Sequence, residues 1–234
     1  MTDDWREGTS RVPRPASAAR DWYDALSRWY RYVEPFEAAA REAGLDLLDA
    51  SAGETVLDAA AGAGGALVSL AGDVGPAGLA CGVDVAAGMC RVERGRLADA
   101  GLTDRSAVVR GDVRSLPFRD GVADAVFCSF ALELFDAPDV PRVLSEFSRV
   151  LGDDGRLVVV SLSSEPGHAG GRRREAAAVA VYERLHEAFP TALDCRPIPV
   201  AAVLRDGGFR VERHLALSEW GLPVHAVLAR PDPA

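Results

Sequence analysis

The sequence predicts an α/β fold built on a doubly wound, mostly parallel, seven-stranded sheet with helices on both faces. Along the middle of the chain, short apolar runs alternate with helical segments, which is typical of parallel strands buried on both sides. Two more apolar runs follow a helical insertion near the end and can close the sheet. The 234 residues, 48% of them hydrophobic, suffice for one large domain with a buried core.

The first 50 residues are expected to precede the sheet. Residues 1–16 are polar and contain two prolines, which favours a flexible tail. Residues 17–50 predict an N-terminal helical cap of two helices. In the first, aromatic and apolar residues recur at steps of three and four up to residue 33, and the second covers residues 35–50.

Residues 51–165 are expected to form the core of the domain. The segment LGDDG at 151–155 is expected to be a turn that leads into the most apolar strand. The strands are expected at 55–59, 79–85, 107–109, 124–130 and 155–162, and the helices at 65–72, 86–101 and 139–151.

The last third of the chain is expected to complete the same single domain. Residues 166–208 predict a helical lid or substrate region, interrupted by DCRPIP at 194–199. Residues 209–230 hold two closing strands, near 209–217 and 222–229.

Charge and cysteine content restrict the class of partner. A net charge of −9 argues against nucleic acid as the partner. The four cysteines form no C-x-x-C pair, so we expect neither a metal site nor a redox motif. With no signal peptide and no apolar run of bilayer length, we expect a cytoplasmic protein without a transmembrane segment. An arginine cluster at 172–174 leaves peripheral membrane contact open, and the oligomeric state is undetermined.

The stretch VLDAAAGAGG at 56–65 predicts a ligand-binding loop between a strand and a helix. It fits the dinucleotide fingerprint poorly, because alanine stands at the first glycine position and an acid already ends the first strand. It fits better the template of an acid, a small residue and two glycines at alternate positions. In this chain those positions are Asp58, Ala60, Gly62 and Gly64.

Further motifs follow in order: GVDVAAGM at 82–89, VVRGDVRSLPF at 108–118 and DAVFCSFALELF at 124–135. Together with the loop they resemble class I methyltransferases that depend on S-adenosylmethionine. The resemblance implies a Rossmann-like methyltransferase fold, with Asp84 on the ribose hydroxyls, Met89 over the adenine and Asp112 on the adenine amino group. The residues implied to bind the cofactor are Tyr23, Asp58, Ala60, Gly62, Gly64, Asp84, Val85, Met89, Gly111, Asp112, Val113 and Ser129.

Within that family, the alanine at position 60 and the segment YDALSRWYR at 23–31 resemble the C-methyltransferases of ubiquinone and menaquinone biosynthesis. Those enzymes continue the fourth strand as S-F-G-L-R-N, whereas this chain reads SFALEL. Glu133 therefore replaces an arginine and Leu134 replaces an asparagine. The implied function is methyl transfer to a small molecule, with a quinol carbon as one acceptor.

Two alternatives stay open: an N- or O-methyltransferase acting on another small molecule or a lipid head group, and a module that binds the cofactor without turnover. Methyl transfer needs a base only when the acceptor must lose a proton. The candidates for that role are His168, Glu133 and His186, each of which has a plainer reading as a loop, helix-start or packing residue.

Overall fold

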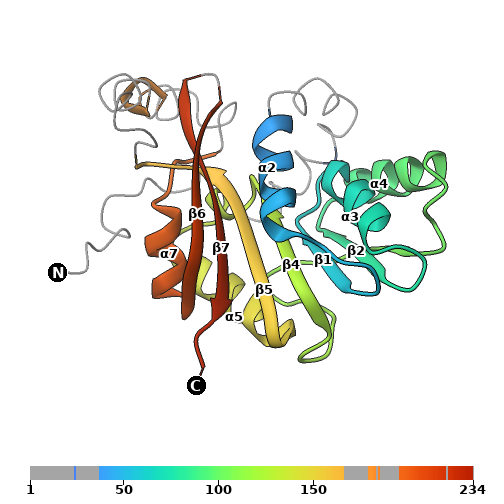
Figure 1. The fold of residues 1–234 in the computed structure, drawn as a ribbon. Coiled ribbons are helices and arrows are strands. Elements are labelled where there is room, and N and C mark those ends of the chain that lie inside the picture. The colour runs from blue at the N-terminus through green and yellow to red at the C-terminus, as the bar shows by residue number, and fades with distance from the viewer. Residues whose placement is uncertain are drawn as a thin grey trace.

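The computed structural model describes Asp24 and residues 37–165, 179–182, 184, 195–219 and 221–233. Within this part of the chain, the strands form one seven-stranded sheet in the order β3-β2-β1-β4-β5-β7-β6 (Figure 1). The strands are β1 (Thr55–Ala59), β2 (Leu79–Asp84), β3 (Ser106–Arg110), β4 (Ala123–Ser129), β5 (Leu151–Leu162), β6 (Phe209–Glu219) and β7 (Leu222–Pro231).

The predicted doubly wound sheet is confirmed. Strands β1 to β5 pair in parallel, while β7 runs antiparallel to β5, and β6 antiparallel to β7. The chain builds outward from β1 through β2 and β3, then returns to place β4 on the other side of β1. This reversal creates a switch point beyond the carboxyl ends of β1 and β4, where ligands bind in sheets of this kind.

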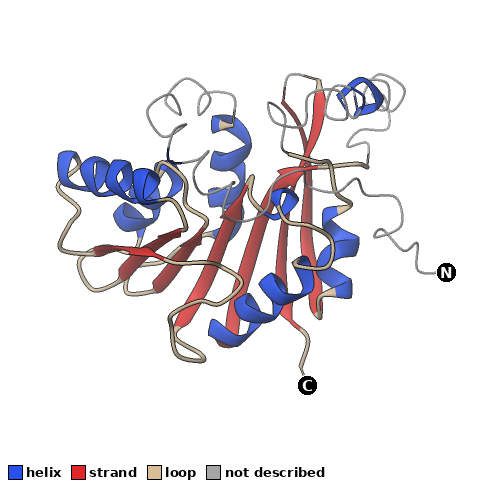
Figure 2. Ribbon diagram, turned by 180° about the vertical axis from the view of Figure 1, so that it is seen from behind, coloured by secondary structure: helices blue, strands red, loops and turns tan. Residues whose placement is uncertain are grey.

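Helices cover both faces of the sheet, as Figures 1 and 2 show from opposite sides. Side chains of α2 and α3 pack with one face of β1, β4 and β5, whereas those of α5 and α7 pack with the other. No helix in the described residues is long and apolar enough to cross a membrane. The helices are α2 (Ala38–Leu48), α3 (Gly65–Asp73), α4 (Ala87–Asp99), the 3-10 helix η3 (Leu132–Leu134), α5 (Val140–Val150) and α7 (Val200–Asp206).

The second helix of the predicted cap, α2, is a layer of the core. Its Gly44 lies directly on the sheet, since a Cβ there would fall 2.3 Å from Val160 and 3.1 Å from Phe127. Of the first predicted helix and the tail, only Asp24 lies within the described residues.

The described end of the predicted lid also joins the core. Ile198 is fully buried and forms a parallel bridge with Ser163, just beyond β5. Helix α7 then packs against β6 and β7. The rest of residues 166–194 lies outside the described residues except for 179–182 and 184, so the lid stays a prediction.

The predicted turn at 151–155 is wrong, because β5 begins at Leu151. Ala123 pairs with Leu151 and Ala125 with Arg156, so β5 advances five residues while β4 advances two. The glycines and aspartates that suggested a turn instead occupy an irregularity in a paired strand, where extra residues are left without partners on the neighbouring strand.

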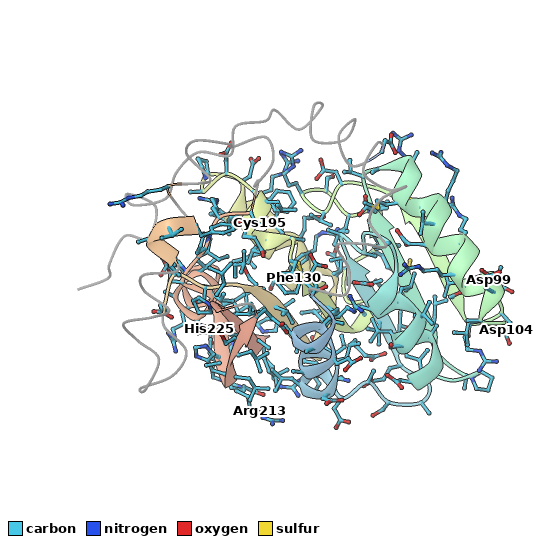
Figure 3. All side chains as sticks on the ribbon, turned by 90° about the horizontal axis from the view of Figure 1, so that it is seen from above. Asp99, Asp104, Phe130, Cys195, Arg213 and His225 are labelled. Atoms are coloured by element: carbon cyan, nitrogen blue, oxygen red, sulfur yellow. The ribbon has the colours of Figure 1, made fainter. Side chains whose placement is uncertain are left out.

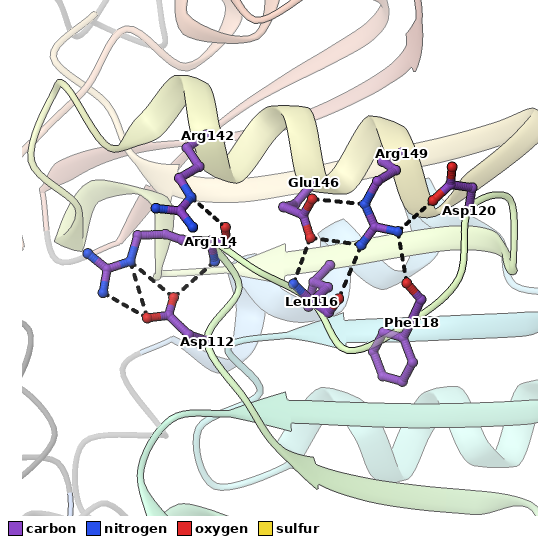
Figure 4. A network of polar contacts seen from close by, with 8 residues as sticks. All are labelled: Asp112, Arg114, Leu116, Phe118, Asp120, Arg142, Glu146 and Arg149. Atoms are coloured by element: carbon purple, nitrogen blue, oxygen red, sulfur yellow. Dashed lines mark hydrogen bonds and ion pairs between the residues drawn. The ribbon is translucent and has the colours of Figure 1, made fainter.

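A polar network fixes the loop between β3 and β4 to α5 (Figure 4). The Arg149 guanidinium donates to the carbonyls of Leu116 and Phe118 and to the carboxylates of Asp120 and Glu146. The Leu116 N–H in turn donates to Glu146 Oε2 at 2.7 Å. The network holds in place the loop that carries Asp112.

Candidate cofactor site

The loop after β1 is shaped by residues in the left-handed backbone region. Gly62 has φ 57° and Gly64 has φ 77°, which suits glycine because it lacks a Cβ. Gly64 is the N-cap of α3 and has no side chain that could cap the helix, while the Asp58 carboxylate accepts the Leu67 N–H of the first turn. The remaining amide groups at the start of α3 can bind a ligand carboxylate.

Ala60 lies in the same loop with φ 58°, a conformation that costs an alanine about 1–2 kcal/mol. Ala60→Gly removes this backbone strain, but glycine loses more conformational entropy on folding than alanine does. We expect the net effect to be a rise of up to about 1 kcal/mol in the free energy of unfolding, measured by urea titration. The matched control is Ala59→Gly, because Ala59 lies buried in β1 and should lose stability instead. A loss of stability in both variants would contradict this interpretation of Ala60.

Asp84 ends β2 and ties it to the loop. Its Oδ2 accepts the Gly62 N–H at 3.0 Å and its Oδ1 accepts the Ala86 N–H at 2.8 Å. Burial raises its pKa to about 6, although backbone hydrogen bonds from Ala86, Gly62 and Val85 oppose that shift. Since the two carboxylate oxygens together can accept about four hydrogen bonds, acceptor capacity remains for a ribose hydroxyl.

Asp58 is buried near the end of β1, one residue before its last residue Ala59, and keeps an unsatisfied oxygen. Only 1% of Asp58 is exposed, and its Oδ2 has no hydrogen-bond partner among the described residues. Burial raises its pKa to about 7, against the positive charge of Arg41 on α2. A cationic amino group bound beside α3 would satisfy this oxygen, so the site fits the amino-acid end of S-adenosylmethionine.

Asp112, which the resemblance places on the adenine amino group, binds Arg114 in the structure. Its carboxylate accepts a forked interaction from Arg114, with Nε at 3.0 Å and Nη2 at 2.7 Å, which holds its pKa below the usual range. Arg114 also pairs with Asp139 at 2.7 Å. An adenine amino group would therefore compete with Arg114 for Asp112, and the predicted adenine contact stays a prediction.

The other predicted cofactor residues surround these acids. The Gly111 N–H donates to the Asp84 carbonyl at 3.0 Å, and the Val85 carbonyl accepts from Arg110. Met89 is only 1% exposed and packs with Ala63 and Ala86. Its side chain would have to move before it could cover an adenine. Val113 is buried in the core, and Ser129 is partly buried at the end of β4.

Glu133, a candidate base, lies in the first turn of the 3-10 helix η3 and is fully buried. Its Oε1 accepts the Leu162 N–H at 3.3 Å, while its Oε2 has no partner among the described residues. Burial raises the pKa of Glu133 to about 7. The charge of Glu133 also acts on Arg196, whose guanidinium donates to the Phe135 carbonyl.

Sequence reasoning missed several residues of this region. Asp24, from the Tyr-Asp motif, accepts the Gly88 N–H at the start of α4. Phe130 has φ 50° directly after β4, and strain of this kind is often found at functional sites (Figure 3). The predicted residues Tyr23, His168 and His186 lie outside the described residues, as does the arginine cluster at 172–174.

The fold and these strand-end acids define a protein that binds a nucleoside cofactor at the switch point of a Rossmann-like sheet. A family model described as a methyltransferase domain matches residues 56–155. A demethylmenaquinone methyltransferase of Listeria monocytogenes is 30% identical over 74% of this chain and 69% of its own. A nocamycin O-methyltransferase of Saccharothrix syringae is 38% identical over 58% of this chain.

The fold itself matches a 1,6-didemethyltoxoflavin-N1-methyltransferase of Burkholderia thailandensis, with a TM-score of 0.70 at 18% identity, over 96% of this chain and 95% of that one. The chain belongs to the S-adenosylmethionine-dependent methyltransferases and resembles their quinone-methylating group. Its cofactor is therefore S-adenosylmethionine. The chain spans about half the length of several relatives that it matches, 45% for the nocamycin enzyme.

Proposed function

We propose that this protein transfers a methyl group from S-adenosylmethionine to a small aromatic acceptor, and that a quinol carbon is the acceptor. The observation that carries this proposal is a pair of buried acids near the ends of neighbouring strands, Asp58 on β1 and Asp84 on β2. The loop after β1, which contains Ala60, is hydrogen-bonded to Asp84 through the Gly62 N–H. A relative that covers 74% of the chain is named as a demethylmenaquinone methyltransferase, which supports the acceptor class.

In this proposal the protein aligns the acceptor with the methyl group and keeps water out, because the leaving group is neutral and needs no acid. Glu133 is the base that removes a hydroxyl proton and so makes the acceptor ring electron-rich. Its support is a buried oxygen without a described partner and a pKa of about 7, close to neutral pH. His168 and His186 remain the other candidates for the base.

Methylation of oxygen on another small molecule is the second candidate function, favoured by the similarity to the nocamycin O-methyltransferase. In addition, this chain has Glu133 in the SFALEL segment where the quinone methyltransferases have an arginine. A cofactor-binding module without turnover is the third reading.

The test supplies methyl-labelled S-adenosylmethionine with a prenylated demethylquinol, and in parallel with a hydroxylated aromatic acceptor that lacks a prenyl chain. Transfer of label to a ring carbon of the quinol supports the first function, and transfer to oxygen supports the second. Tight cofactor binding in calorimetry, with no labelled product from these acceptors or from cell extract, would favour a binding module.

A further inference from the structure

Glu93 of α4 is a buried acid that none of the family motifs accounts for. Its side chain has no exposed surface, and neither carboxyl oxygen has a hydrogen-bond partner among the described residues. A buried carboxyl group without partners is costly, and more costly still when ionised. Its place in the fold therefore calls for an explanation beyond packing.

The side chain of Glu93 lies directly beneath the cofactor loop. A Cβ at Gly64 would fall 2.9 Å from Glu93 Cγ, so the stem of the glutamate touches the N-cap residue of α3. A Cβ at Gly82 would fall 2.4 Å from Glu93 Oε2. The carboxyl group thus occupies the space that a side chain at Gly82 would otherwise fill.

This position brings Glu93 beside Asp58. Gly82 is the register partner of Asp58 in the parallel pair of β1 and β2, so their Cβ directions point to the same face of the sheet. The two carboxyl groups therefore lie about one strand spacing, ~5 Å, apart, within reach of each other through one water. The oxygen Oδ2 of Asp58 also lacks a described partner.

We propose that Glu93 is a positioning residue that stays a neutral carboxylic acid and donates a hydrogen bond, through one water, to Asp58, holding that carboxylate toward the amino group of the cofactor. The inference rests on the proposed S-adenosylmethionine site. One neutral donor beneath an ionised acceptor satisfies both buried groups, whereas two ionised carboxylates at this distance would repel each other.

The surrounding charges are consistent with a neutral Glu93. Burial, together with the charges of Asp58 and Asp84, raises the pKa of Glu93 to about 9, and Arg94 on its own helix only partly opposes this. Arg41 on α2 instead favours the ionised form of Asp58. The nearby thiols of Cys81 and Cys90 have pKa values raised to about 11 by burial, so they carry no charge near neutral pH.

The first test measures the stability of the cofactor-free protein against pH. Because the folded protein binds the Glu93 proton more tightly than the unfolded chain does, this group should make the protein less stable as pH rises from about 5 to 9. Glu93→Gln cannot ionise, so its melting temperature should fall less over this range and should exceed that of the wild type at pH 9. The control is Asp99→Asn, which removes an exposed acid from the end of α4 (Figure 3).

The second test measures S-adenosylmethionine binding by calorimetry at pH 7. Glu93→Gln keeps a donor and should bind within about threefold of the wild type, while Glu93→Leu fills the space without a donor and should bind at least about tenfold more weakly. Wild-type affinity in Glu93→Leu, or a pH profile of Glu93→Gln parallel to the wild type, would overturn the proposal. Failure of the wild type to bind the cofactor would contradict the proposed function instead, while the stability test would still report on Glu93.

Discussion

Asp84→Ala is expected to weaken S-adenosylmethionine binding at least about 100-fold, because it removes the charged acceptor that we propose for the ribose hydroxyls. The same change frees the Gly62 and Ala86 N–H groups, which Asp84 holds at 3.0 and 2.8 Å. The loop would then lose its link to β2 even before a ligand binds. Calorimetry at pH 7.5, above the raised pKa of about 6, compares wild type and variant with Asp84 ionised.

The matched control for this prediction is Asp104→Ala, since Asp104 is an exposed acid beyond the end of α4 (Figure 3). Its loss should leave cofactor affinity within about twofold, because an exposed ion pair contributes little. Circular dichroism should report a folded protein for both variants. If a folded Asp84→Ala still binds the cofactor within tenfold of the wild type, the assignment of Asp84 is wrong.

Glu133→Gln is expected to lower kcat about 10²–10⁴-fold on an acceptor that must lose a proton, since the amide cannot act as a base. In the wild type, kcat should rise with pH through about 7 and then level off, because the base works in its ionised form. That rise should be absent in the variant, while the dissociation constant of S-adenosylmethionine stays unchanged.

A purely structural role of Glu133 predicts a different result. The raised pKa means that Glu133 makes the folded protein less stable as pH rises from about 4.5 to 7, so Glu133→Gln should flatten the stability profile in either case. Unchanged kcat together with a flatter stability profile would show that Glu133 only packs near Arg196. Glu165→Gln is the control, because Glu165 is an exposed acid shortly after β5.

Much of the cofactor site could be predicted from the order of local signals. Each acid follows a buried apolar run, and parallel strands place their carboxyl ends at one edge, so Asp58 and Asp84 had to lie close together. A sequence signal for Glu93 also existed, because it lies four residues from both Met89 and Leu97 on the buried face of α4. An acid on an apolar helix face is a signal of a functional or paired group.

The sequence by itself determined the fold class, the position of the ligand-binding loop and the family, because these depend on periodicity and on short motifs within single elements. Only the tertiary structure decided which partner each charged group meets. It paired Arg114 with Asp139 at the start of α5, brought Arg196 toward Glu133 and placed Glu93 in the space left by Gly82. These pairings join residues from different elements and depend on side-chain burial, which local sequence patterns do not encode.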